Sequence, residues 1–305
     1  MARTALVTGA YGFVGRYVAR QMAAEGWRVV GVGHGSWTRA EWQRWGLAEW
    51  HEADVTLDTL VRYGGKPEVI MHCAGSGAVS FSLIQPYQDF LRTVVSATEV
   101  LEFIRLHVPA ARMVYPSSAG VYGASERLPI VESQPLAPAS PYGMHKLMAE
   151  EMCQSYARHF GLAVTVVRLF SVYGIGLRKQ LLWDACTKIS VGEKLFFGSG
   201  TEIRDWLHVS DAAKLLSIAA QHASADCTVV NGGSGQGVGV REILSELFAA
   251  FGSGDRPEFS GNARAGDPVN YLADISRACN WGWQPQIEWR EGVHEYAQWY
   301  RGGAI

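Results

Sequence analysis

The chain has 305 residues, of which 48% are hydrophobic and 18% charged, and its formal net charge is −2. This length predicts one large domain with a smaller lobe, and the small net charge argues against nucleic acid or an anionic membrane as a partner. The sequence contains no apolar run that could span a bilayer, and its N-terminus lacks the charged-then-apolar pattern of a signal peptide. We therefore expect a cytoplasmic protein.

The first half of the chain alternates strand-like and helix-like segments. Such alternation is typical of βαβ units on a parallel sheet. The predicted strands are 5–7, 27–32, 69–72, 113–115 and 163–169, and the predicted helices are 14–24, 87–107 and 141–159. We therefore predict an α/β fold, with a Rossmann-type doubly wound parallel sheet in a dinucleotide-binding domain over residues 1–170.

After residue 170 the alternation decays. Helical spacing of apolar residues predicts helices at 181–189 and 209–222 and a further helix from Val240, with a short strand at 229–230. We expect residues 171–305 to form mainly a substrate-binding lobe, with some of these later segments returning to the first domain. The five cysteines are scattered, without metal-ligand spacing, and predict reduced thiols and no metal site.

A glycine-rich loop links the first predicted strand to the first predicted helix. Its sequence is Thr-Gly-Ala-Tyr-Gly-Phe-Val-Gly at 8–15. Gly9 permits the tight turn, Gly12 lets the backbone approach a pyrophosphate, and Gly15 allows close packing of helix and strand. The helix N-terminus at Phe13 and Val14 offers free amides to phosphates. This context favours a dinucleotide site over a mere strand–helix turn.

The end of the second strand distinguishes NAD from NADP in such folds. An acidic residue there holds the ribose 2′-hydroxyl of NAD, whereas small or basic residues admit a 2′-phosphate. Gly33 occupies this place, and His34, Ser36 and Arg39 follow it. The segment favours NADP, with NAD as the alternative. Arg39 can also be interpreted as a solvated residue at the start of a helix.

Tyr142 and Lys146 lie four residues apart in a predicted helix, and a serine pair, Ser117 and Ser118, precedes them. A tyrosine hydroxyl titrates near pH ~10 and is a poor base at neutral pH. Side chains four apart share a helix face, so the Lys146 ammonium is expected to lower the pKa of Tyr142. The pair predicts a nicotinamide-dependent oxidoreductase whose proton donor and acceptor is a tyrosine.

These motifs are followed by Arg-Asp-Trp-Leu-His-Val at 204–209, and the tyrosine motif is preceded by Ser-Ser-Ala-Gly-Val-Tyr-Gly at 117–123. In this order the chain closely resembles the extended short-chain dehydrogenase/reductase family, in its branch of nucleotide-sugar epimerases, dehydratases and 4-ketoreductases. The resemblance covers nearly the whole chain, including Gly266-Asp267 and residues 273–276.

The resemblance implies a role for each matching residue. Tyr142 would be the catalytic acid and base, Lys146 would lower its pKa and bond the nicotinamide ribose, and Ser118 would bond the reacting oxygen of the sugar. The implied cofactor contacts are Asp54 and Val55 with the adenine, and Ala74 and Gly75 with the ribose and phosphate. The implied contacts with the sugar or its nucleoside diphosphate are Ser117, Arg178, Arg204, Arg264 and Asp267.

Two of these assignments have structural alternatives. Arg178, with Lys179, also fits a solvated basic turn, and Arg204 also fits a salt bridge with Asp205.

Departures from the family pattern reduce the number of reactions that we expect this chain to catalyse. The 4,6-dehydratases of the family carry an Asp-Glu pair directly after the catalytic Ser or Thr, where this chain has Ala119 and Gly120. Dehydration is therefore not expected. Thr93 and Ser171 each replace an asparagine that is common in the family, which affects details of the cofactor and substrate contacts.

The leading interpretation is the reduction of a nucleoside-diphosphate 4-keto-(6-deoxy)hexose by NADPH, with Tyr142 as the proton donor. The alternative is a nucleoside-diphosphate-sugar 4-epimerase with tightly bound NAD, and the alternative from another class is a non-catalytic dinucleotide-sensing protein. The resemblance also implies a homodimer formed through helices 87–107 and 142–159.

Overall fold

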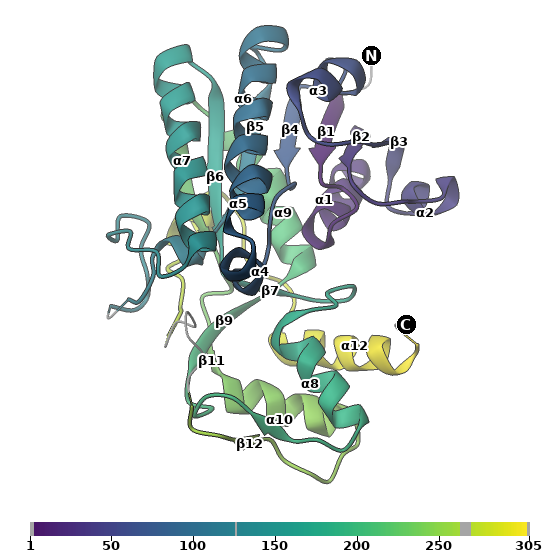
Figure 1. The fold of residues 1–305 in the computed structure, drawn as a ribbon, viewed down its shortest axis with the longest axis vertical. Coiled ribbons are helices and arrows are strands. Elements are labelled where there is room, and N and C mark those ends of the chain that lie inside the picture. The colour runs from purple at the N-terminus through teal and green to yellow at the C-terminus, as the bar shows by residue number, and fades with distance from the viewer. Residues whose placement is uncertain (1–2, 126, 263–269, 304–305) are drawn as a thin grey trace.

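The structure, a computed structural model, describes residues 3–125, 127–262 and 270–303. Its centre is a seven-stranded sheet with the order β10-β6-β5-β4-β1-β2-β3, in which all pairings are parallel (Figure 1). The strands are β1 (Thr4–Thr8), β2 (Arg28–Gly33), β3 (Leu47–Glu52), β4 (Val69–His72), β5 (Arg112–Ser118), β6 (Ala163–Leu169) and β10 (Thr228–Gly232). The predicted α/β fold is confirmed.

Helices cover both faces of this sheet. On one face α1 (Phe13–Ala24) packs against α9 (Val209–Ala219), and on the other α3 (Leu57–Tyr63) and α7 (Pro141–Phe160) pack against α6 (Ser96–His107). Alternate residues of β1 pack on opposite faces of the sheet, because successive side chains of a strand point in opposite directions. Val7 lies in the core beneath α1, whereas Leu6 lies in the core beneath α6.

Local sequence signals define the ends of the long helix α7. Ser140 caps α7 by accepting a hydrogen bond from the Gly143 amide, Pro141 occupies the first turn, and Gly161 ends the helix with φ +70°. The predicted helix 87–107 is interrupted. It consists of α5 (Pro86–Phe90), a π-helical turn η1 (Leu91–Val95) and α6.

Several short elements complete the first domain. They are α2 (Arg39–Arg44), α4 (Val79–Ile84), α11 (Ser276–Asn280) and the 3₁₀ turns η2 (Ala119–Val121) and η3 (Ala220–His222). Capping boxes at Thr38 and Thr56 start α2 and α3.

A second lobe lies below the carboxyl ends of the sheet strands (Figure 1). Its helices are α8 (Gln180–Ser190), α10 (Val240–Ala250) and α12 (Trp289–Arg301), and its strands are β7 (Ser171–Tyr173), β8 (Leu195–Phe196), β9 (Ile203–His208), β11 (Gly237–Gly239) and β12 (Glu258–Phe259). Strands β11, β9 and β7 form a small sheet. Within the described ranges, no helix is long and apolar enough to cross a membrane.

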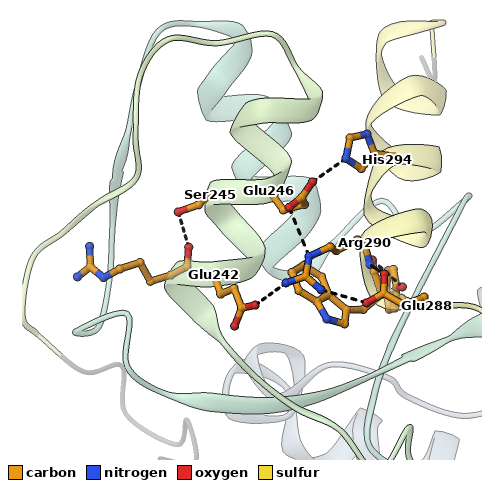
Figure 2. A network of polar contacts seen from close by, with 9 residues as sticks. Glu242, Ser245, Glu246, Glu288, Arg290 and His294 are labelled. Carbon is orange, nitrogen blue, oxygen red and sulfur yellow. Dashed lines mark hydrogen bonds and ion pairs between the residues drawn. The ribbon is translucent and has the colours of Figure 1, made fainter.

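Helices α10 and α12 contact each other through buried apolar side chains and, at the surface, through polar side chains. Figure 2 shows the surface, where Arg290 bonds Glu242 at 2.9 Å and His294 bonds Glu246 at 2.7 Å. These groups are largely exposed, and such pairs contribute at most about 1 kcal/mol each. Burial of side chains such as Leu247 therefore accounts for most of the cohesion of this lobe.

Asp205 joins three segments that are distant in sequence. Its buried carboxylate accepts hydrogen bonds from the Ser234 amide and hydroxyl, at 2.5 and 2.8 Å, and from the amides of Gly235 and Ala273, at 3.0 and 3.1 Å. Burial raises the pKa of this carboxyl group, although the hydrogen bonds act in the opposite direction. The aspartate thus holds the glycine-rich turn after β10 and the segment before α11 against β9.

We expect Asp205→Asn to destabilise the protein by about 2 kcal/mol or more, because its amide group would turn a donor toward backbone N–H groups. The change in the free energy of unfolding can be measured by urea denaturation. Asp226→Asn, at an exposed position, is the control and should leave the midpoint unchanged. Equal midpoints for both variants would contradict this role of Asp205.

Candidate active site

The glycine loop lies against the end of β4. Gly9 has φ +68°, and a Cβ atom placed there would lie 2.6 Å from the backbone of Ala74. A Cβ atom at Gly15 would lie 2.2 Å from the Gly9 carbonyl oxygen. Neither position can accept a side chain, so both glycines allow β1, α1 and β4 to approach closely. This is the packing that a pyrophosphate-binding turn requires.

The N-terminus of α1 opens at the same edge of the sheet. Gly12 has extended backbone and donates its amide to the Gly9 oxygen at 2.9 Å, and the helix begins at Phe13. The amides of the first turn, which includes Val14, have no acceptor within the helix. They are suited to bind phosphate oxygens, and the predicted dinucleotide fits this loop.

The ends of β2 and β3 are lined by carboxylates. The His34 Nε2 atom lies 2.7 Å from the Asp54 carboxylate, and the Ser36 hydroxyl lies 3.3 Å from both oxygens of Glu52. These are two of the side chains from which we expected contacts with a 2′-phosphate. The third, Arg39, is the exposed first residue of α2. This is the alternative interpretation of Arg39, a solvated residue at the start of a helix. Val55 follows Asp54 and is half-buried.

The structure brings Ser118, Tyr142 and Lys146 together where β5 ends and α7 begins. The Ser118 hydroxyl accepts from the Gly120 amide at 3.1 Å. Burial raises the pKa of the Tyr142 hydroxyl, and the Ser118 hydroxyl partly offsets this shift. The Lys146 ammonium donates to the Pro116 carbonyl at 3.0 Å. The three predicted catalytic residues therefore lie at one edge of the sheet.

Gly75 follows β4, the strand next to β5, and lies close to Lys146. A Cβ atom at Gly75 would lie 4.0 Å from the Lys146 Nζ atom. The loop of Ala74 and Gly75, the glycine loop and Lys146 thus share one edge of the sheet, where the resemblance implies a dinucleotide.

The electrostatics of the pair differ from the sequence-based prediction. Burial is the main influence on both groups: it raises the pKa of the Tyr142 hydroxyl and lowers the pKa of Lys146 to about 8. The pKa of Tyr142 is thus shifted in the direction opposite to the prediction. Desolvation disfavours the charged forms of both groups.

A buried hydrogen-bonded pair beside α7 was missed from the sequence. Asp89 on α5 is fully buried, and its carboxylate lies 2.6 Å from the Nδ1 atom of His145, which precedes Lys146. The negative charge of Asp89 raises the pKa of both Tyr142 and Lys146. Glu99 and Glu102 are acidic residues of the same predicted helix, so no signal in the sequence distinguished Asp89 as the buried one.

The predicted substrate residues are placed differently from one another. Arg204 is half-buried and donates to the Ile203 carbonyl, whereas Arg178 is exposed beside the ring of Trp299. Ser117 is buried and donates its hydroxyl to Glu150, so the structure gives no support to its predicted sugar contact. Arg264 and Asp267 lie outside the described residues.

Comparison with known proteins agrees with this geometry. A model of the NAD dependent epimerase/dehydratase family matches residues 5–233. The chain belongs to this family. The match includes the glycine loop, the serine and the tyrosine–lysine pair, so the predicted resemblance is confirmed.

The similarity to individual relatives extends over almost the whole length of this chain. A UDP-glucose 4-epimerase of Mycolicibacterium smegmatis is 31% identical over 97% of this chain and 98% of its own, and one of Azospirillum brasilense is 30% identical over 94% and 89%. A solved UDP-glucose 4-epimerase of Thermotoga maritima with UDP-glucose has a TM-score of 0.87 and 25% identity, covering 99% and 100%. MoeE5 in complex with UDP-glucose and NAD has a TM-score of 0.84 and 28% identity, also covering 99% and 100%.

We expect Tyr142→Phe to lower turnover of a nucleotide sugar by about a hundredfold or more, because it removes the only atom of this side chain that can transfer a proton. Steady-state rates at saturating substrate test this. Tyr156→Phe is the matched control, since Tyr156 lies on the same helix and bonds Glu102 instead. Equal activity of the two variants would contradict the assignment.

Proposed function

We propose that this protein is a UDP-sugar 4-epimerase that uses NAD. The observation that carries the proposal is the meeting of Ser118, Tyr142 and Lys146 beside the dinucleotide loop. The near full-length similarity to UDP-glucose 4-epimerases supports the choice of substrate. The carboxylates that engage His34 and Ser36 support NAD over NADP, because a 2′-phosphate would be repelled by them.

The side chains have complementary roles in this reaction. Tyr142 takes the proton of the C4 hydroxyl as C4 loses a hydride, and it returns the proton after hydride is added to the opposite face of the 4-keto sugar. Ser118 holds the reacting oxygen in line with Tyr142. Bound NAD would supply the hydride acceptor, and Lys146 would contribute positive charge next to the tyrosine and a bond to the nicotinamide ribose.

The surroundings of the catalytic residues oppose dehydration. A Cβ atom at Gly120 would lie 3.3 Å from the Ser118 hydroxyl and 3.6 Å from the Tyr142 ring. This position therefore faces the reacting oxygen, but it has no carboxyl group that could remove a proton or protonate a leaving hydroxyl. The neighbouring Ala119 is equally inert, so the site favours reactions confined to C4.

We expect purified protein to convert UDP-galactose into UDP-glucose with NAD in catalytic amounts. Product sugar nucleotides can be separated by anion-exchange chromatography at equilibrium. The competing hypothesis, 4-ketoreduction, predicts stoichiometric oxidation of NADPH by a 4-keto-6-deoxy nucleotide sugar, which absorbance at 340 nm would reveal. NADPH oxidation without interconversion of the UDP-sugars would overturn the epimerase proposal.

We also propose a homodimer, which the resemblance implied from the two long helices. Apolar side chains on α4, α5 and α7 remain exposed, and these are Leu83, Ile84, Tyr87, Met144 and Met148. Large exposed apolar patches commonly mark protein interfaces.

Sedimentation velocity at micromolar concentration should therefore give about twice the mass of one chain. Ile84→Glu should shift the protein toward the monomer, because it places a charge at the most exposed of these side chains. The matched control is Val191→Glu, an exposed apolar residue of the second lobe. A wild-type monomer, or equal behaviour of both variants, would contradict the dimer.

A further inference from the structure

The strand that usually supplies the acidic ribose ligand of an NAD site ends here in a glycine. Gly33 is the last residue of β2, and its register partner on the neighbouring strand is Glu52, the last residue of β3. Register partners on adjacent strands point to the same face of a sheet, and their Cα atoms lie about 4.8 Å apart. An acidic side chain therefore starts one strand away from the place where the family pattern expects it.

Strand β2 passes beside both the glycine loop and the Trp50 ring at Gly33. A Cβ atom at Gly33 would lie 3.2 Å from the Cα atom of Gly9, so β2 passes directly beside the dinucleotide turn. Gly33 itself contributes no side chain to this space. The Glu52 side chain is exposed and turns toward the loop after β2, where the Ser36 hydroxyl lies 3.3 Å from each of its oxygens.

The charges near Glu52 do not neutralise it. His34 is paired with Asp54, and Arg28 and His51 lie against Glu49 farther back on β2 and β3. The closest hydrogen-bond partner of Glu52 is the neutral Ser36 hydroxyl. Glu52 is thus an exposed carboxylate at the end of β3, in register with Gly33 and next to the loop that follows β2.

We propose that Glu52 takes over the role of the missing acid of β2: it accepts hydrogen bonds from the ribose hydroxyls of the cofactor's adenosine and excludes a 2′-phosphate. A carboxylate can accept from two vicinal hydroxyls, and its charge repels a phosphate at the same position. The inference rests on the proposed use of a dinucleotide cofactor and assigns its selectivity to a residue outside β2.

Binding measurements without any sugar substrate test this role. Titration calorimetry of the wild-type protein should show at least about tenfold tighter binding of NADH than of NADPH, as expected for one charge-assisted hydrogen bond. In Glu52→Gln the affinity for NADH should fall and that for NADPH should rise, so that the preference shrinks about tenfold. Glu49→Gln, which changes an exposed acid of the same strand, should retain the wild-type preference.

A second readout is the binding of an NADH analogue that lacks the 2′-hydroxyl on the ribose of its adenosine. Wild-type protein should bind it more weakly than NADH, whereas Glu52→Gln should bind the two cofactors about equally. An unchanged NADH-to-NADPH ratio in Glu52→Gln, or a wild-type preference for NADPH, would overturn the role of Glu52. These outcomes are independent of epimerisation, since selective NADH binding that depends on Glu52 can occur in a protein that fails to interconvert UDP-sugars.

Discussion

The buried ion pair between Glu150 and Arg168 is the constraint on which the catalytic geometry depends. The Glu150 carboxylate is fully buried and accepts bonds of 2.7–3.1 Å from the Arg168 guanidinium, together with the Ser117 hydroxyl. Glu150 lies one helical turn after Lys146, and Ser117 directly precedes Ser118. The pair therefore fixes α7 against β5 and β6, and loss of one partner would leave an uncompensated charge at a cost of several kcal/mol.

The same network continues into the far edge of the sheet. Arg168 also donates to the Tyr122 hydroxyl, which in turn donates to the Asn231 side chain on β10. The Asn231 amide group reaches the Ile130 carbonyl. Three strands and the loop before α7 are thus held by paired polar groups, which fixes the backbone around Ser118 and Tyr142.

The sequence predicted those features that depend on local chemistry. Strands β4 and β6 were predicted with the observed bounds, and the predicted glycine loop joins β1 to α1. Features set by tertiary packing were not predictable: desolvation of Tyr142 reversed the expected direction of its pKa, and Glu150 engages the hydroxyl of Ser117. The NADP expectation considered the end of β2 and the residues that follow it, whereas register with β3 places Glu52 beside Gly33.

The two lobes are joined by hydrogen-bonded backbone at two of their chain connections. The chain passes from β6 into β7 through the single residue Phe170, and β9 runs directly into α9 at His208 (Figure 1). Strands β7 and β9 pair with one another, and the Phe170 amide donates to the Gly232 carbonyl. A displacement of β7 relative to the large sheet must therefore be shared by β9 or break these hydrogen bonds. The position of the small sheet is in this way tied to β6 and β10, the strands at one edge of the large sheet.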